Sequence, residues 1–464
     1  MFQKNIKIGC LITIFGMVLF SCSYAQTYDL FELLEVGKQN YPLLKSKLAD
    51  VQSFNRRISS VKNAYIPDVV VGHQYTYATS NNVEGAFFPY EGTTISPSGG
   101  VRSENIYQPT FGSFTTAMLD WRIINFGKVS ANIDVAKAQK DNSQADYENE
   151  LFQYQVRLAD TYLLLLISRQ LREVQEYNLQ RAENFRNTVM ALVSAGLRAG
   201  VDSSLANAEY ARAKLALLES QKNEKAYMYR LTELLGEIKD TISIDSMSFF
   251  NELPRSVTFN PSSIVNSPIL KFHQSTISLA NARSIAIKRS YFPSISLLGA
   301  GWARGSGIYN EDSSYRTDLV SGVRYQVYNY LVGVAFRWNV SSYFRIRNEF
   351  KSQLYQVDKF RFLYENQLLQ QSREVQEADV QFEVSLQQAQ QAHVQLAAAQ
   401  SAFAQAQSRY ESGLTDIPTY SQSFVTVNRA EADTYIAYSN AWRALLMKAA
   451  AAGDLSIFLN QIKR

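Results

Sequence analysis

The chain has 464 residues and carries 46 Lys and Arg against 42 Asp and Glu, which gives a formal net charge of +4. This balance argues against a nucleic-acid partner, which needs a strongly basic face, and a hydrophobic share of 46% argues against a disordered chain. Both cysteines, Cys10 and Cys22, lie near the start, and only three histidines follow. The rest of the chain therefore offers no disulfide, no thiolate metal site and no cysteine nucleophile, and we expect no cofactor.

The first 25 residues are typical of an export signal. Two lysines precede an apolar run from Ile8 to Phe20, which is short for a membrane span but suits the core of a signal peptide. A cut after Ala25 has small residues at its −1 and −3 positions, which predicts a signal peptide over residues 1–25. The alternative is a lipoprotein site at Leu19-Phe20-Ser21-Cys22, in which Cys22 carries the lipid. Either way the chain is exported, and no later segment is apolar enough to predict a membrane-spanning helix.

The chain after this signal contains two copies of one pattern. Tyr41-Pro42-Leu43-Leu44-Lys45 resembles Ser267-Pro268-Ile269-Leu270-Lys271. Further matches, in the same order and at nearly constant spacing, are Tyr65-Ile66-Pro67 and Tyr291-Phe292-Pro293, Trp121 and Trp338, Phe126 and Tyr343, Lys128 and Arg345, and Gly196-Leu197 and Gly413-Leu414. We therefore expect a first structural repeat over residues 27–250, a linker over 251–261 and a second repeat over 262–464.

Each repeat begins with a helix, expected over residues 28–64 and 268–290, that a Tyr-x-Pro ends. Two strands follow around a loop rich in Gly, Ser, Asn and Pro, and we expect them at about 66–77 and 113–125, and again at about 292–304 and 325–340. In the last strand, alternation places on one face Tyr328, Tyr330, Val332, Val334 and Phe336. Large apolar residues on one face and small or polar residues on the other are typical of a transmembrane barrel strand. The alternative is a soluble hairpin with one buried face.

A long helical region completes each repeat. From Lys128 to Ala195 and from Arg345 to Ser412 there is neither Pro nor Gly, and an unbroken helix of this length would reach about 100 Å. Its apolar residues recur at every third or fourth position and form a narrow seam, while Gln, Asn, Ser and Ala dominate much of the rest. Taken alone, this pattern also fits a soluble coiled coil.

The expected strands are too few to form a closed barrel from one chain, because the smallest common barrel has about eight. A membrane sheet with open edges would leave unpaired backbone groups in lipid, and each such group costs several kcal/mol. We therefore expect several copies to share one barrel. The predicted fold class is mainly α with a transmembrane β part: a duplicated helix-hairpin-helix-helix repeat whose strands join a shared β-barrel and whose long helices form an α-barrel.

These features together resemble the TolC-type outer-membrane efflux factor family. The resemblance rests on the two Pro-initiated helices, the Tyr-x-Pro before each hairpin, the segment from Leu119 to Lys128, and Ala195-Gly196-Leu197 with its echo Ser412-Gly413-Leu414. The residues that match the family's strand-to-helix junction are Trp121, Phe126, Gly127, Trp338 and Tyr343. The resemblance implies a homotrimer whose shared β-barrel lies in outer-membrane lipid and whose α-helical tunnel extends into the periplasm.

The resemblance also places a periplasmic tip at the two Gly-Leu turns. It implies that a periplasmic adaptor docks there, on Gly196, Leu197, Gly413 and Leu414. A plain helix C-cap explains the same residues without a partner, because a tight turn between helices needs a residue that accepts positive φ.

For gating of this tip, the resemblance implies Asp202 and an aromatic partner, Tyr410. Asp202 fits a helix N-cap as well. Thr415 stands where the family has an arginine, and Thr419 and Gln422 stand where it has acidic residues that line a constriction. This chain therefore lacks that arginine and that acidic ring.

The function that the resemblance implies is a passive exit duct, the outer-membrane channel of a tripartite efflux or type I secretion system. Its substrates would arrive from an inner-membrane RND or ABC transporter through the periplasmic adaptor. The sequence contains no P-loop and no Gly-rich turn after a strand, and we expect no enzyme. The alternative is an exported structural coiled-coil protein, such as an adhesin stalk or a scaffold, without a channel.

Overall fold

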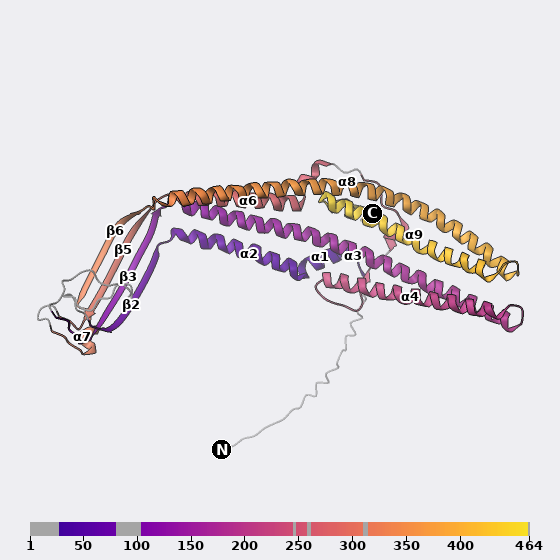
Figure 1. Cartoon of the computed structure of the whole chain (residues 1–464), viewed down its shortest axis with the longest axis horizontal. Coiled ribbons are helices and arrows are strands. Elements are labelled where there is room, and N and C mark those ends of the chain that lie inside the picture. Colours follow the sequence, from indigo (N-terminus) through magenta and orange to yellow (C-terminus); the bar gives the residue numbers. More distant parts are fainter. Residues whose placement is uncertain (1–26, 80–103, 245–246, 258–260, 310–313, 463–464) are drawn as a thin grey trace, which may run out of the picture.

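The computed structural model describes residues 27–79, 104–244, 247–257, 261–309 and 314–462. The expected signal peptide, with its cut after Ala25 and the alternative lipidation of Cys22, lies outside these residues. The molecule is elongated, with an antiparallel sheet at one end and two long helical hairpins that run side by side to the other end (Figure 1).

The two halves of the chain share one order of elements. In each half a helix leads into a β-hairpin, then into a helix of 67 or 70 residues, and then into a returning helix. The helices are α1 (Leu30–Asn40), α2 (Pro42–Lys62), α3 (Lys128–Ser194), α4 (Gly200–Leu234), α5 (Met247–Asn251), α6 (Pro268–Arg289), α7 (Leu319–Val323), α8 (Ser342–Glu411), α9 (Ile417–Ala452) and α10 (Ser456–Ile462). The strands are β1 (Thr27–Tyr28), β2 (Asp68–Ala78), β3 (Thr110–Ile124), β4 (Ser243–Ile244), β5 (Ser294–Ser306) and β6 (Val327–Arg337).

The first helical segment is broken at Tyr41, so the single helix expected over residues 28–64 is wrong. Asp29 caps α1: its carboxylate accepts the Glu32 backbone N–H at 2.7 Å, and Glu32 reaches back to the Asp29 backbone N–H at 3.3 Å. Tyr41 is extended, with φ −63° and ψ 120°, and Pro42 opens α2. The first helical position suits proline because its missing N–H is not needed there.

The long helices pack in pairs, α3 with α4 and α8 with α9, and α3 also packs against α9. This second contact joins the two hairpins into one body. The main hydrophobic core lies near mid-length, where α1, α3, α4, α9, α10 and β4 meet. Its most deeply buried side chains include Leu33, Tyr154, Leu158, Leu165, Leu231, Leu445 and Phe458.

The connection between the two halves is tied to α9. The indole Nε1 of Trp442 donates to the Glu252 carbonyl oxygen at 3.1 Å, and the Lys448 ammonium donates to the Val257 carbonyl oxygen at 2.6 Å. The Lys448 ammonium, whose side chain is 8% exposed, also pairs with the Asp379 carboxylate at 2.8 Å. The segment that the sequence suggests is a linker is therefore held against the helices wherever the structure describes it.

The larger sheet has the strand order β2-β3-β5-β6, and all its neighbours are antiparallel. The register places Val71, Ala117, Gly301 and Tyr330 in one row across the sheet. The face that contains this row, called the aromatic face below, has side chains that are 58 to 87% exposed: Val69, Val71, Tyr75, Tyr77, Tyr328, Tyr330, Val332, Val334 and Phe336. The opposite face, called the polar face, includes the row Gly72, Thr116, Trp302 and Asn329.

The outer strands β2 and β6 each have a neighbour on one side only among the described residues. Each therefore presents a row of unpaired backbone N–H and C=O groups on its other side. Nothing in the described chain covers the exposed aromatic face of β6, either. The sheet is thus incomplete along both edges.

Candidate functional site

The far ends of the two helical hairpins are built in the same way. At the end of α3, Gly196 has φ +73°, and the Leu197 N–H donates to the Leu192 carbonyl oxygen at 2.9 Å. At the end of α8, Gly413 has φ +76°, and the Leu414 N–H donates to the Arg409 carbonyl oxygen at 2.8 Å. These are two Schellman motifs, in which a left-handed glycine satisfies the last carbonyl groups of a helix.

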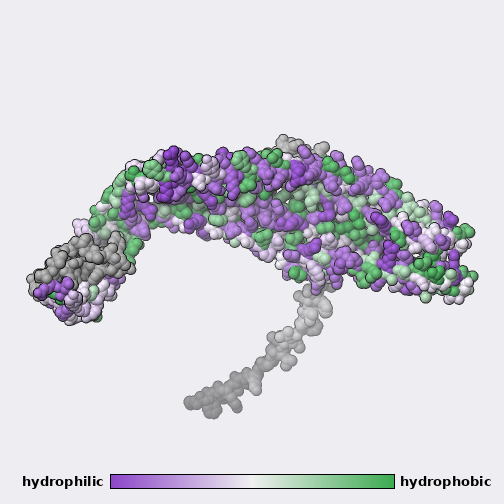
Figure 2. Space-filling model, viewed as in Figure 1, coloured by the Kyte–Doolittle hydropathy of each residue, from purple (hydrophilic) through white to green (hydrophobic). Residues whose placement is uncertain are grey.

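Each turn exposes its leucine. Leu197 and Leu414 are both 70% exposed, so the apolar contact that often accompanies a Schellman motif hides little of either side chain. Figure 2 shows hydrophobic residues at this end of the molecule and again where the sheet joins the helices. A C-cap alone therefore does not account for the choice of leucine at both turns.

The acidic residue after the first turn is not a cap. The N-cap of α4 is Ala199, and Asp202 lies at the third helical position, so the alternative in which Asp202 caps the helix is wrong. Its side chain is half-buried and makes no hydrogen bond or ion pair in the part of the chain that the structure describes. Thr419 holds the equivalent position of α9, where its backbone N–H donates to the N-cap Asp416 at 3.2 Å.

The other residues expected at the gate differ in their surroundings. Thr415 is half-buried in the second turn, and Gln422 is exposed on α9. Tyr410, by contrast, is 2% exposed at the end of α8. The structure therefore brings one of the expected gate residues, Tyr410, into a packed environment and leaves Gln422 on the surface.

Tyr410 belongs to an aromatic group that joins the two hairpins, called the tip cluster below: Phe185, Phe403, Tyr410, Tyr420 and Phe424. The ring of Phe185 on α3 stacks on that of Tyr420 on α9 with centroids 4.2 Å apart. Burial raises the pKa of Tyr420 to about 12 and also raises the pKa of Tyr410, so both hydroxyls stay neutral at physiological pH.

Two ion pairs strengthen the same contact between α3 and α9. Asp160 receives two hydrogen bonds from Arg443, the shorter at 2.7 Å, and Arg181 pairs with Glu431. These side chains are 20 to 32% exposed. The hairpins are therefore joined by partly buried charges along their length and by aromatic rings at their end.

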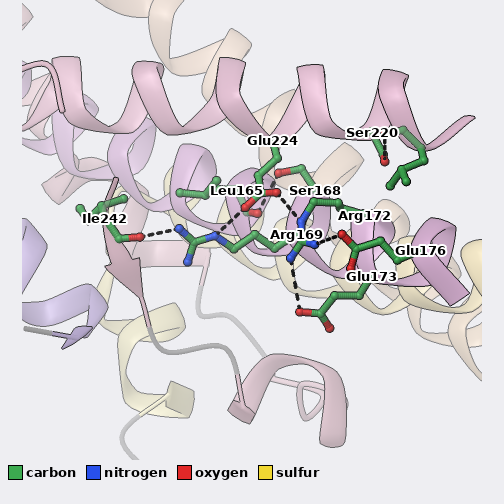
Figure 3. A network of polar contacts seen from close by, with 10 residues as sticks. Leu165, Ser168, Arg169, Arg172, Glu173, Glu176, Ser220, Glu224 and Ile242 are labelled. Carbon is green, nitrogen blue, oxygen red and sulfur yellow. Dashed lines mark hydrogen bonds and ion pairs between the residues drawn. The ribbon is translucent and has the colours of Figure 1, made fainter. Parts of the chain in front are cut away.

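A third polar network fixes the first hairpin internally (Figure 3). Glu224 on α4 accepts hydrogen bonds from Arg169 at 3.2 Å and from Arg172 at 2.7 Å, and Arg169 also donates to the Ile242 carbonyl oxygen of the segment leading into β4. Burial opposes the charge on Arg172, but the carboxylates of Glu176 and Glu224 together raise its pKa. The network holds α3, α4 and β4, the strand that pairs with β1, in one arrangement.

The junction between sheet and helices repeats one hydrogen bond. The indole Nε1 of Trp121 donates to the Tyr65 carbonyl oxygen at 2.9 Å, and that of Trp338 donates to the Tyr291 carbonyl oxygen at 3.2 Å. The ring of Tyr343 packs against that of Tyr291 with centroids 5.6 Å apart. Four aromatic residues of the two junctions are 39 to 46% exposed: Tyr65, Trp121, Trp338 and Tyr343.

The first junction also contains two left-handed residues. Phe126 has φ +45° and Gly127 has φ +83°, directly before α3 begins. A left-handed phenylalanine is strained, because its Cβ approaches the backbone. The second junction turns without a positive φ, since Asn339 accepts the Ser342 N–H with its side chain at 3.2 Å.

The described residues contain no group of His, Cys, Asp or Glu that could hold a metal ion. None of the helices in this part of the chain is both long enough and apolar enough to cross a bilayer. A cavity of about 870 Å³ opens between α1 and the connection from α4 to β4. Two of the cations in its lining are already paired, Lys239 with Glu237 and Arg169 with Glu224.

A family model described as outer membrane efflux protein matches residues 33–237 and 262–446. The chain belongs to the outer membrane efflux protein family. The match covers both repeats and confirms the family and the fold class that the sequence predicted. Membership makes the protein an outer-membrane efflux channel.

Solved structures agree with this assignment at the level of the fold. The outer-membrane channel OprN is 18% identical, with 91% of this chain and 89% of that chain covered and a TM-score of 0.72. The Campylobacter jejuni CmeC outer membrane channel is 14% identical, with 94% and 88% covered and a TM-score of 0.74. The outer membrane protein VceC from Vibrio cholerae is 14% identical, with 92% and 96% covered and a TM-score of 0.72. None of the curated protein sequences matches the chain.

The sequence alone missed three residues of this efflux protein's hairpin ends. Phe185 and Tyr420 form the stacked pair of the tip cluster, and Arg198 contacts Tyr410 from the opposite turn. The apolar periodicity of α3 and α9 could have predicted that Phe185 and Tyr420 are buried, because both lie on the apolar seams of these helices. Arg198 directly follows the first Gly-Leu, but nothing in the sequence shows which residue it contacts.

Proposed function

We propose that three copies of this protein form a passive exit duct through the outer membrane. Each copy would give four strands to one β-barrel and its long helices to a periplasmic α-barrel. In this proposal a periplasmic adaptor links the duct to an inner-membrane RND or ABC transporter, which delivers the substrates in a tripartite efflux or type I secretion system. The duct itself has no chemical step to perform.

The observation that carries the proposal is the pair of open edges. In Figure 1, α2 leads directly into β2 along one edge of the molecule, and β6 leads directly into α8 along the other. Pairing β6 of one copy with β2 of the next therefore also brings α8 beside the neighbour's α2. Repetition of one such head-to-tail contact closes a ring. In a closed ring no strand edge is left open to lipid.

The helices along these two edges of the molecule also expose apolar side chains. On α8 these are Phe344, Tyr355, Phe362, Leu369, Val380 and Val394, which are 61 to 74% exposed. On α2 and α4 they are Leu43, Leu48, Val201, Leu205, Leu215 and Leu218, which are 41 to 68% exposed. Long rows of exposed apolar residues favour contact with another copy over contact with water.

The two faces of the sheet support the same arrangement. The aromatic face suits lipid, and the half-exposed tryptophans at the junction suit the boundary between lipid and water. The polar face carries an ion pair between Asp120 and Arg337 at 2.9 Å, and the register places Asp68 directly beside Asp120. A face with these charges suits the water-filled lumen of a channel.

At the other end, Leu197 and Leu414 are the residues we propose for adaptor docking, with Gly196 and Gly413 shaping the turns. Changing both leucines to serine keeps the backbone of the turns and removes the exposed apolar groups. We expect this double variant to assemble normally and to lose cross-linking to the adaptor. Retained cross-linking at the wild-type level would rule out this surface.

The position of the first strand bears on how the chain is processed. Thr27 pairs with Ser243 through β1 and β4, near the middle of the molecule. Cys22 lies five residues earlier, a reach of about 18 Å at full extension, whereas the 21 residues of α2 alone span about 32 Å on the way to the sheet. This favours the cut after Ala25 over lipidation of Cys22. The mass of the purified protein distinguishes the two, because a diacylated cysteine adds several hundred daltons.

The test of the whole proposal is fractionation followed by electrophoresis. We expect the protein in the outer-membrane fraction, soluble only in detergent, and migrating as a trimer that heating converts to monomer. In planar bilayers this trimer should conduct ions. The alternative function, an exported coiled-coil scaffold, instead gives a protein that leaves the membrane without detergent and does not conduct.

A further inference from the structure

Thr415 stands at the position after the second turn where the family that the sequence resembles has an arginine. A cation from the first hairpin nevertheless contacts the end of the second hairpin. The guanidinium of Arg198, two residues after Gly196, lies 4.8 Å from the centroid of the Tyr410 ring. It also donates a hydrogen bond to the Tyr410 carbonyl oxygen at 3.3 Å. One side chain of the first turn therefore holds both the ring and the backbone of the second hairpin's last helical turn.

Tyr410 is a firm anchor for this contact. Its ring packs against Phe185 with centroids 5.6 Å apart and against Tyr420 with centroids 5.4 Å apart. Its hydroxyl oxygen is buried and has no hydrogen-bond partner. The hydroxyl therefore contributes nothing to the link, and the aromatic ring and the carbonyl group carry it.

Arg198 is suited to this role because it is half-buried. A cation over an aromatic face gains more as water is removed from around the pair. Arg409, which precedes Tyr410, offers a comparison within the same turn: it is exposed, and its side chain makes no hydrogen bond or ion pair in the described part of the chain. The two arginines carry the same charge at the same end of the molecule, but only one joins the hairpins.

We propose that Arg198 is a positioning residue that latches the two hairpin turns of each copy together and keeps the periplasmic end of the duct narrow. This inference rests on the proposed function, because a latch matters only if the hairpins surround a passage. The contact is a cation on an aromatic ring, supplied by the first turn. It requires neither the carboxylate of Asp202 nor the hydroxyl of Tyr410.

The test compares single-channel currents of purified trimers in planar bilayers. Arg198→Ala should shift each copy toward the unlatched state by about two- to thirtyfold, the range expected for such a contact between exposed and desolvated settings. Mean conductance, or the fraction of time spent in a high-conductance state, should rise accordingly. Arg409→Ala removes the same charge and should behave like the wild type. An equal rise in both variants would overturn the latch and point to a general effect of charge.

Substitutions at Tyr410 and Arg198 separate a latch from general weakening of the tip. Tyr410→Phe keeps the ring and should leave the currents unchanged, whereas Tyr410→Leu should raise them. In the Tyr410→Leu background, Arg198→Ala should raise the currents by less than it does in the wild type, because the ring contact is already lost and only the hydrogen bond to the backbone carbonyl of residue 410 remains to be broken. Arg198→Lys retains a cation and should restore part of the closed behaviour. Additive effects in the double variant, or a rise in Tyr410→Phe as large as in Tyr410→Leu, would contradict the proposal.

The current measurements can refute the latch without refuting the duct. If the wild-type trimer conducts and Arg198→Ala conducts equally, the latch is wrong and the duct stands. If no variant inserts or conducts, the proposed function itself fails. Trimer content, measured by electrophoresis without heating, must be equal for all variants that are compared.

Discussion

At the scale of single residues, the hairpin turns show where glycine is required and where it is not. Gly196 has φ +73° and no heavy atom within 4 Å of an added Cβ, so only its backbone conformation resists substitution. Gly200, at the start of α4, has equally open surroundings without a positive φ. We expect Gly196→Ala to destabilise the turn by about 1–2 kcal/mol, the cost of a left-handed conformation for a residue with a Cβ.

Gly200→Ala is the matched control for this change. It adds the same methyl group to the same loop but in a conformation that alanine accepts, so it should leave the turn unchanged or slightly steadier. Amide hydrogen exchange of the peptide that spans the turn measures both effects. Equal exchange rates in the two variants would show that the positive φ of Gly196 is not needed.

The stability of the second turn should depend on pH. Hydrogen bonds from Thr419, including its backbone N–H, lower the pKa of the Asp416 carboxyl below its ordinary value of 3.8. Because the folded pKa is depressed, this cap stabilises the start of α9 above about pH 4 and loses its effect as the pH falls through the folded pKa. The protection of the amides in the first turn of α9, measured relative to the intrinsic exchange rate at the same pH, should therefore fall in acid.

Asp416→Asn isolates this effect from the titration of other carboxyl groups. Asparagine caps helices about as well as aspartate but does not titrate in this range. The acid-induced loss of protection at residues 417–420 should therefore be smaller in Asp416→Asn than in the wild type. If both proteins lose the same protection in acid, another group controls the second turn.

At the scale of elements, the contact between α3 and α9 determines whether the two hairpins act as one body. Asp160 and Arg443 form a partly buried pair with two hydrogen bonds. Arg443→Met keeps most of the side chain's volume and leaves the Asp160 carboxylate without its partner. We expect a loss of about 1.5–3 kcal/mol, because hydrogen bonds to charged groups contribute in this range. The measurement is the apparent midpoint of thermal unfolding of the trimer in detergent.

An exposed pair on α8 serves as the control. Arg361 lies 3.6 Å from Asp358, and both side chains are about half exposed. Exposed pairs contribute about 0–1 kcal/mol, so Arg361→Met should shift the midpoint less than Arg443→Met. An equal shift would mean that the pair between the hairpins has no special role.

The elements themselves could largely be predicted from the sequence, because their causes are local. Alternation in β6 follows from a period of two, and the length of α3 and α8 follows from the lack of Pro and Gly between Lys128 and Ala195 and between Arg345 and Ser412. The break at Tyr41 was missed, although proline disfavours helix in the residue before it.

Contacts between the repeats could not be predicted in this way. Phe185 and Tyr420 come from different repeats, and each occupies an apolar seam position that many other residues share. The contact of Arg198 with Tyr410 depends on how two separate turns lie beside each other. The spacing of apolar residues along the sequence does not predict that arrangement. The resemblance therefore identified the turns and Tyr410, but the residue that joins the turns emerged only from the packed structure.

At the scale of the whole molecule, the decisive question is which face of the sheet meets lipid. Val332 is the central residue of β6, is 74% exposed and lies on the aromatic face. Its neighbour Leu331 points to the polar face and is 47% exposed. An arginine at the middle of a lipid-facing strand destabilises the barrel by about 2–4 kcal/mol in each copy. An arginine that faces a water-filled lumen stays in water and carries no such penalty.

We therefore expect Val332→Arg to abolish the heat-sensitive trimer in the outer membrane, and Leu331→Arg to assemble with altered ion selectivity. The two variants differ by one position in the same strand and carry the same new side chain, so expression and strand propensity are matched. Assembly of both would mean that this strand does not contact lipid. Assembly of Val332→Arg alone would mean that the faces are reversed, with the aromatic residues lining the lumen. In a soluble scaffold, which has no lipid contact, arginine at these two exposed positions should have similar effects.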